Sequence, residues 1–364
     1  MSPAPSIRWL SAAVIAASLP VNAAPPAPNT PTTSAAATAT APASGRAGRG
    51  GLTVNPPPDA QTVPLAPPLD QTGNFKIAPQ TTWADVSAIT VKDDVPRGKL
   101  TTFTLKSEDT KMYPGVNGPY QRNVWVYVPA GYQEGAELPL MVDHDGAAGA
   151  VIQTQLIAVL DNYIAAKRLP PMAAVFIANG GDVQGRSERS LEYDTPSGQY
   201  AEYIEKEVLP LAEKNAHVKF THDPDARGVI GQSSGSAAAL AMAWFHNDWY
   251  HRVISYSGTF VNIKNSPELP HGAWEYHEHL IPQSAKKPLR IWLEVGSRDL
   301  GATTAEDGFR NWPLANNRMA EVLKAKGYDY QYVWADAASH VERGVERQTL
   351  PEAMEWLWKT YQPK

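Results

Sequence analysis

The pentapeptide GQSSG at residues 231–235 contains the clearest candidate for a reactive side chain, Ser233. An apolar β-like run ends just before it, and an alanine-rich helical pattern follows at 237–245. This context predicts a sharp strand-to-helix turn that presents the serine hydroxyl for nucleophilic attack. Glycine suits both ends of the motif because such a turn brings neighbouring backbone close to a strained serine. The alternative is a Ser/Gly-rich turn in which Ser233 only caps the helix.

A serine nucleophile needs a general base and a carboxylate that orients the base. Asp299 and His340 each follow an apolar strand pattern, and they come after the serine in the order acid, then histidine. His340 alone among the nine histidines follows Asp299, so chain order selects it over the reading as a surface histidine. Glu294 and Glu306 compete for the acid role, but Glu294 lies within a predicted strand. We therefore predict Asp299 as the acid.

Acyl transfer also requires backbone N–H donors for the oxygen that becomes negatively charged. We expect one donor from Ser234, directly after the nucleophile, and the other from Gly146 or Ala147 in the loop after the strand at 138–142. The run at 143–145, Asp-His-Asp, could instead suggest metal ligands. Neighbours at a strand end point to opposite sides, so we predict no metal at this site.

A charged loop at 185–194 and several tryptophans provide candidates for substrate contact. Arg186 and Arg189 could recognise a polar or acidic substrate. The alternative is an ion-pair network that holds the loop in place. Of the eleven tryptophans, Trp274 and Trp312 are among those that could line a sugar or aromatic site.

His271, His277 and His279 form a second cluster of potential metal ligands. No acid or cysteine pattern of the catalytic zinc type accompanies them. We interpret residues 270–281 as a loop or short helix near the mouth of the site, and we predict no cofactor for the protein.

Apolar strand patterns alternate with helical patterns along residues 100–361, which predicts a mostly parallel, doubly wound sheet flanked by helices. Ligands bind beyond the carboxyl ends of the strands in such sheets. Four polar loops follow predicted strands, so we expect them to converge on one site. The loops are 143–147, 179–194, 232–236 and 296–299. The predicted strands are 100–105, 124–128, 138–142, 173–177, 229–230, 253–256, 289–295 and 330–334, and the predicted helices are 155–164, 200–211, 237–245, 313–327 and 354–361.

Composition divides the chain into three parts. Residues 1–23 resemble a cleaved signal peptide, with a basic start, an apolar run too short for a membrane span and a small-residue cleavage pattern. Residues 24–81 are rich in Pro, Ala, Thr and Gly, which predicts a flexible linker. Residues 82–364 suit one large α/β domain. The chain has no cysteine, which excludes disulfides and thiolate metal sites, and its net charge of -5 argues against nucleic acid or an anionic membrane as the main partner.

Further stretches carry a family resemblance: VWVYVPAGY at 124–132, the Asp145-Gly146 loop, RSERSLEY at 186–193 and EVLP at 207–210. Together with GQSSG they resemble the "putative esterase" family of α/β-hydrolases, over about residues 99–361. That family includes enterobactin-type siderophore esterases, feruloyl and acetylxylan esterases, and antigen 85-like acyltransferases. The resemblance implies an α/β-hydrolase fold with Ser233, Asp299 and His340 as a catalytic triad. One departure is Ser236, which stands where many members have a second glycine.

These observations lead us to expect an exported serine ester hydrolase that works through an acyl-enzyme. Its expected substrates are feruloyl or acetyl esters of plant polysaccharides or oligosaccharides, since a polymer must be met outside the cytoplasm. Three alternatives stay open. They are hydrolysis of a catecholate siderophore lactone, an acyltransferase of the same fold, and a non-catalytic carbohydrate-binding relative, which would lack a member of the triad.

Overall fold

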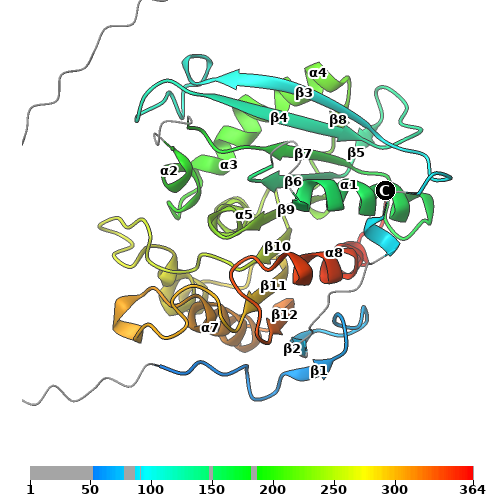
Figure 1. The fold of residues 1–364 in the computed structure, drawn as a ribbon. Coiled ribbons are helices and arrows are strands. Elements are labelled where there is room, and N and C mark those ends of the chain that lie inside the picture. The colour runs from blue at the N-terminus through cyan, green and yellow to red at the C-terminus, as the bar shows by residue number, and fades with distance from the viewer. Residues whose placement is uncertain (1–51, 78–86, 91, 147–150, 182–186, 364) are drawn as a thin grey trace, which may run out of the picture. The chain divides into compact units, whose positions relative to one another are not determined.

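A ten-stranded sheet forms the centre of the computed structural model, which describes residues 52–77, 87–90, 92–146, 151–181 and 187–363. The strands, in their order across the sheet, are β1 (Gln61–Val63), β2 (Gly73–Ile77), β12 (Asp329–Ala335), β11 (Arg290–Gly296), β10 (Arg252–Tyr256), β9 (Arg227–Gln232), β6 (Leu140–His144), β7 (Ala173–Ile177), β4 (Gln121–Val128) and β3 (Lys99–Lys106). Neighbours from β1 across to β7 pair in parallel, whereas β4 and β3 run antiparallel at one edge. Figure 1 shows the sheet from β3 at the top to β1 at the bottom. The mostly parallel sheet predicted from the sequence is confirmed.

Helices cover both faces of this sheet, because successive strand side chains point to opposite sides. Ile230 and Trp292 belong to a core cluster under α1 and α8, whereas their neighbours Val229 and Leu293 belong to the cluster under the remaining long helices. The described helices are α1 (Val151–Ala165), α2 (Arg189–Tyr193), α3 (Gln199–Tyr203), α4 (Leu209–Ala216), α5 (Ser234–Phe245), α6 (Ile281–Gln283), α7 (Trp312–Ala325) and α8 (Arg343–Trp358). A second, two-stranded sheet pairs β5 (Glu137–Leu138) with β8 (Lys219–Phe220).

The predicted linker at 24–81 is wrong for the part that the structure describes. β2 pairs with β12 along Gly73–Ile77, and β1 pairs with β2 to form the edge of the main sheet. Phe75 is fully buried, and the Asn74 side chain bonds to the Tyr330 hydroxyl at 3.0 Å. The low average hydrophobicity of this segment gave no sign of strands in the sequence. A short edge strand needs only two or three apolar side chains to pack against the sheet. Residues 1–51 and 78–81, including the predicted signal peptide, lie outside the described residues.

The last helix is longer than the sequence pattern indicates. The predicted helix at 354–361 corresponds to α8, which begins at Arg343 and continues through Pro351. Val345 and Leu350 are fully buried against the sheet, so tertiary packing extends the helix across a residue that normally interrupts one. Within the described part of the chain, none of the helices combines the length and apolarity needed to cross a membrane.

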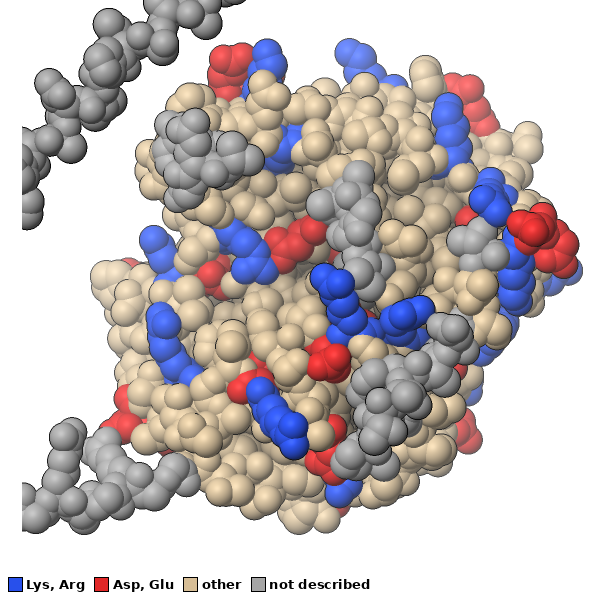
Figure 2. Space-filling model, in the orientation of Figure 1, with Lys and Arg blue, Asp and Glu red and all other residues tan. Residues whose placement is uncertain are grey.

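Charged side chains are interspersed by sign over the face of the molecule shown in Figure 2. Blue and red groups alternate there without a large field of either sign. This distribution agrees with the modest net charge of -5.

Candidate active site

Ser233 lies at the turn between β9 and α5, with φ 54° and ψ -124°. A non-glycine residue rarely adopts a positive φ, so the surrounding structure must hold it there. A Cβ atom added to Gly231 would lie 2.2 Å from the carbonyl carbon of Gly235, which is too close for any side chain. The Ser236 hydroxyl donates to the Gly231 carbonyl oxygen at 2.6 Å and so ties the turn together. The serine at position 236, where many members of the resembled family have glycine, therefore stabilises the turn.

The structure brings the three predicted triad residues into one hydrogen-bonded chain. His340 Nε2 lies 2.9 Å from Ser233 Oγ, and His340 Nδ1 lies 2.6 Å from Asp299 Oδ1. The Asp299 side chain is fully buried and also accepts the Leu300 backbone N–H at 2.6 Å. A carboxylate at Nδ1 favours the tautomer whose Nε2 can accept the serine proton. The geometry is that required for nucleophilic attack by Ser233.

The competing acids lie elsewhere. Glu306 pairs with Arg318 at the surface. Glu294 is buried in β11, and burial, followed by the neighbouring Asp299 charge, raises its pKa well above the ordinary value. Asp299 is therefore the carboxyl group that contacts the histidine.

Thr259, which is not among the site residues predicted from the sequence, also lies at the nucleophile. Its Oγ1 is 3.4 Å from Ser233 Oγ and accepts the Trp312 indole N–H at 3.2 Å. The Trp312 ring packs edge-on to the His340 ring, with centroids 6.1 Å apart. Thr259 follows β10 in a loop without a recognisable motif, so no sequence signal could have found it. Trp312 therefore lies beside the triad, which agrees with its prediction as a residue that could line the site.

The described part of the predicted oxyanion loop packs tightly against β7. A Cβ atom added to Gly146 would lie 2.5 Å from the Phe176 Cβ, so only glycine fits there. Ser234 is the first residue of α5, where a backbone N–H has no partner within the helix. Ala147 lies outside the described residues. The four predicted loops follow β6, β7, β9 and β11, which run in parallel, so their described ends lie at one edge of the sheet.

Two of the predicted substrate contacts have other partners. The Arg189 guanidinium forms a two-point ion pair with the Asp145 carboxylate, with Nε 2.9 Å from Oδ1. The ion-pair alternative is therefore supported over direct substrate contact. Trp274 is fully buried, with its ring against His277 and Phe309, so its prediction as a substrate contact is wrong in this structure. Arg186 lies outside the described residues.

The histidine cluster is only partly a group of potential metal ligands. His277 is buried beside Trp274, and burial lowers its pKa to about 3. Among the described residues, one group that could hold an ion is His271 with Glu275 and Glu278, whose donor atoms lie within 4.8 Å of one another. Each of these side chains already has a hydrogen-bonding partner within the cluster.

Buried carboxyl groups lie on the α8 side of the sheet near the triad. Burial and then the Asp145 and Glu346 charges raise the pKa of Asp143 well above its ordinary value. Burial raises the pKa of Glu346 to about 7, although the Gln232 side chain donates a hydrogen bond to it. His144 points to the opposite face, packs against Tyr193 and has its pKa lowered to about 3 by burial. Asp143 and His144 therefore do not share a metal site.

A mostly parallel sheet with helices on both faces, and a serine on a sharp turn at its carboxyl edge, define an α/β-hydrolase. Residues 119–355 match the family described as "Putative esterase". This match covers well over half of the chain, so the protein belongs to that family of carboxylic ester hydrolases.

Individual relatives agree with the family. The chain is 29% identical over 240 residues to an iron(III) enterobactin esterase of Dickeya dadantii (strain 3937), covering 65% of this chain and 50% of that one. It therefore spans half the length of this relative. The fold resembles an enterobactin esterase of Shigella flexneri (TM-score 0.53, 21% identity, 73% of this chain and 62% of that one). It also resembles a ferulic acid esterase (TM-score 0.52, 16% identity, 73% of this chain and 100% of that one).

Proposed function

We propose that the protein is a serine ester hydrolase in which Ser233, His340 and Asp299 form the catalytic triad. The observation that carries the proposal is the hydrogen-bonded chain from Ser233 Oγ through His340 to Asp299. His340 Nε2 takes the hydroxyl proton as Ser233 Oγ attacks the ester carbonyl carbon, and it then donates that proton to the leaving alcohol. Water, deprotonated by the same nitrogen, hydrolyses the acyl-enzyme and restores the serine.

Two backbone donors would stabilise the negative oxygen of each tetrahedral intermediate. The Ser234 N–H at the start of α5 is one, and its position directly after the nucleophile supports the assignment. The loop at 145–147 would supply the other, from Gly146 or Ala147. Removing one such donor typically costs about 10²–10³ in kcat.

For the substrate, we propose neutral feruloyl or acetyl esters of plant saccharides. Arg189, the first residue of α2, is half-buried and already paired with Asp145, so its charge is neutralised within the protein. Trp312 beside His340 offers an aromatic surface at the site. Export, proposed from the signal-like residues 1–23, would bring the enzyme to such polymers.

A catecholate siderophore ester is the second candidate, and the sequence similarity to iron(III) enterobactin esterases favours it. A panel of methyl ferulate, acetylated xylan and a ferric catecholate trilactone separates the two. The highest kcat/KM on the trilactone would overturn the saccharide-ester proposal. Product analysis with added alcohols identifies acyl transfer, because an acyltransferase would yield a new ester rather than the free acid.

Ser233→Ala tests the reaction itself. We expect no hydrolysis of p-nitrophenyl acetate above background, with an unchanged far-UV circular dichroism spectrum and Tm. Ser87→Ala, at an exposed serine on a short 3-10 helix, is the matched control and should retain full activity. Wild-type hydrolysis by purified Ser233→Ala would refute the triad.

A further inference from the structure

The short helix α2 contacts both segments that would bind the oxyanion. Arg189 binds the Asp145 carboxylate with two N–H groups, immediately before Gly146. Its Nη2 also lies 3.5 Å from the carbonyl oxygen of Gln232, the residue before the nucleophile. Just after the other end of the helix, burial raises the pKa of the Asp194 carboxyl group, and the Ser234 side chain opposes that rise. One helix of five residues thus links the two loops.

Asp145 needs such support because its backbone is strained. Its φ is 63°, a left-handed conformation that disfavours residues with a side chain. A change in this dihedral would turn the peptide that carries the Gly146 N–H. Besides Arg189, the Tyr193 hydroxyl accepts the Asp145 backbone N–H at 3.3 Å. Both restraints on Asp145 therefore come from α2.

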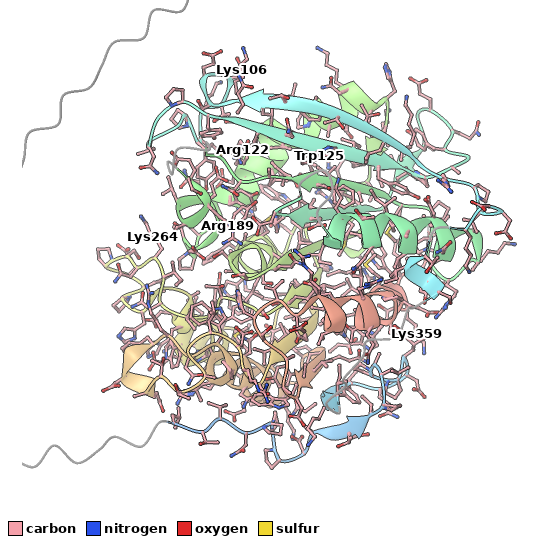
Figure 3. The ribbon with its side chains drawn as sticks, in the orientation of Figure 1. Lys106, Arg122, Trp125, Arg189, Lys264 and Lys359 are labelled. Atoms are coloured by element: carbon pink, nitrogen blue, oxygen red, sulfur yellow. The ribbon has the colours of Figure 1, made fainter. Side chains whose placement is uncertain are left out.

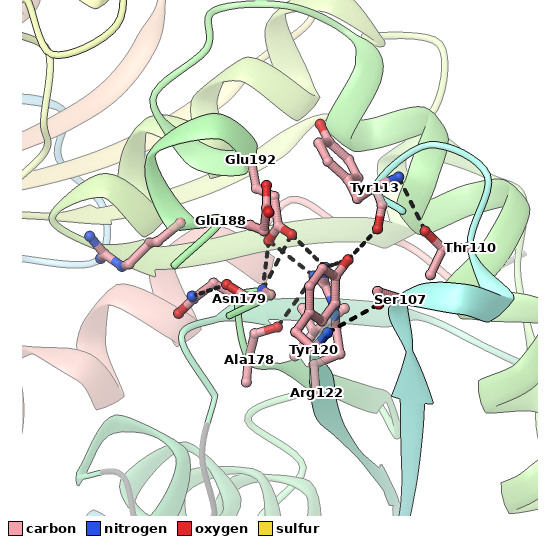
Figure 4. Close-up of polar contacts among 12 residues, drawn as sticks. Ser107, Thr110, Tyr113, Tyr120, Arg122, Ala178, Asn179, Glu188 and Glu192 are labelled. Carbon is pink, nitrogen blue, oxygen red and sulfur yellow. Dashed lines mark hydrogen bonds and ion pairs between the residues drawn. The ribbon is translucent and has the colours of Figure 1, made fainter. Parts of the chain in front are cut away.

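The far side of α2 is fixed to the sheet by a buried ion pair. Glu192 and Arg122 are both fully buried, and Glu192 also accepts the Gly180 backbone N–H at 3.1 Å. Glu188, just before the helix, accepts the Asn117 backbone N–H at 2.7 Å. Figure 4 shows the contacts of Arg122 of β4 with Glu192 of α2, and Figure 3 shows Arg189 on the same side of the molecule. The helix is a rigid support, because a buried ion pair with further hydrogen bonds tolerates little movement.

We propose that Arg189 is a positioning residue that, through Asp145, holds the Gly146 backbone N–H in position to bind the oxyanion. The inference rests on the proposed serine hydrolase function. It assigns a role to the RSERSLEY run that the triad leaves unexplained. Arg189 acts without touching the substrate, so its loss should weaken binding of the transition state more than binding of the ester. Lysine cannot replace it fully, because lysine lacks the two-point geometry of guanidinium.

The test compares Arg189→Gln, Arg189→Lys, Asp145→Asn and the double variant Arg189→Gln/Asp145→Asn on p-nitrophenyl acetate, a neutral ester. For Arg189→Gln we expect kcat to fall on the order of 10²-fold, with KM within about threefold of wild type. The inhibition constant of phenylboronic acid, which forms a tetrahedral serine adduct, should rise in parallel with the fall in kcat/KM. The double variant should lose no more than the single variants, because both remove one interaction.

Arg168→Gln is the matched control. Arg168 forms a two-point ion pair with Glu355 of α8, and this pair is about as exposed as the pair of Arg189 and Asp145. This variant should show a change in Tm similar to that of Arg189→Gln, but its kcat should equal that of the wild type. If the effects of the two single substitutions on kcat add in the double variant, the positioning role is refuted. A rise in KM alone for Arg189→Gln would also refute it. If Arg189→Gln does not fold, Arg189→Lys and Asp145→Asn decide by the same criteria.

Ser233→Ala separates this inference from the function on which it rests. An active Ser233→Ala refutes the proposed function. An inactive Ser233→Ala together with a fully active Arg189→Gln refutes only the positioning role.

Discussion

Replacing Asp299 by asparagine should disable the base while leaving the fold in place. In the structure Asp299 Oδ1 accepts from His340 Nδ1 at 2.6 Å and from the Leu300 N–H at 2.6 Å. An asparagine oxygen at the position of Oδ1 can keep both hydrogen bonds, but it carries no negative charge. The imidazolium that forms when His340 takes the serine proton would then lose the carboxylate that stabilises it.

The expected loss follows from this missing charge. A Ser-His-Asp triad loses about 10⁴ in kcat when asparagine replaces the aspartate, equivalent to about 5.5 kcal/mol in the barrier. The volume of the side chain is unchanged, so Tm should move little. Steady-state hydrolysis of p-nitrophenyl acetate at pH 7.5 measures kcat, and differential scanning fluorimetry measures Tm.

Two neighbouring acids provide the controls. Glu294→Gln should change kcat little, because burial raises the pKa of that carboxyl group and so disfavours its charged form, and glutamine preserves its shape. Glu306→Gln only removes a surface pair with Arg318. A loss below tenfold for Asp299→Asn, or an equal loss for Glu294→Gln, would refute the assignment of the acid.

Two further predictions concern stability. Burial raises the pKa of Glu346 from 4.5 to about 7 in the folded state, so the contribution of this group to stability should be complete below pH 4.5 and lost as pH rises through 7. Relative to Glu346→Gln, which does not titrate, the wild type should lose on the order of 3 kcal/mol of unfolding free energy between pH 4 and 8. Urea titrations at several pH values measure this free energy. Parallel pH dependences for the two proteins would contradict the raised pKa of Glu346. Phe75→Ala should cost about 3–5 kcal/mol, because Phe75 is fully buried where β2 joins the sheet. The same substitution at the half-exposed Leu65 should cost little, and equal costs at both positions would mean that β2 is not part of the folded core.

Much of this fold follows from the sequence alone. Local patterns at 173–177 and 253–256 coincide with β7 and β10, because a strand buried on both faces must be apolar along its whole length. The strands β1 and β2 could not be recognised, since their burial depends on β12, which is distant in the chain. The extension of α8 through Pro351 likewise depends on packing against the sheet rather than on local propensity.

The candidate site divides in the same way. Chain order and the strand-turn-helix context identified Ser233, Asp299 and His340, because the doubly wound topology fixes where each loop must emerge. The sequence favoured Asp299 over Glu294 and Glu306 as the acid, and the folded structure shows that Asp299 is the carboxylate that meets the histidine.

The neighbouring loops required the tertiary structure. The sequence offered Arg189 and Trp274 as candidate substrate contacts, whereas folding pairs Arg189 with Asp145 and buries Trp274. Thr259 carries no motif, yet it lies against the nucleophile. A reactive motif is recognisable because its chemistry constrains adjacent residues. The partners of a side chain on a long loop depend on elements far away in the chain, and the sequence does not encode those contacts locally.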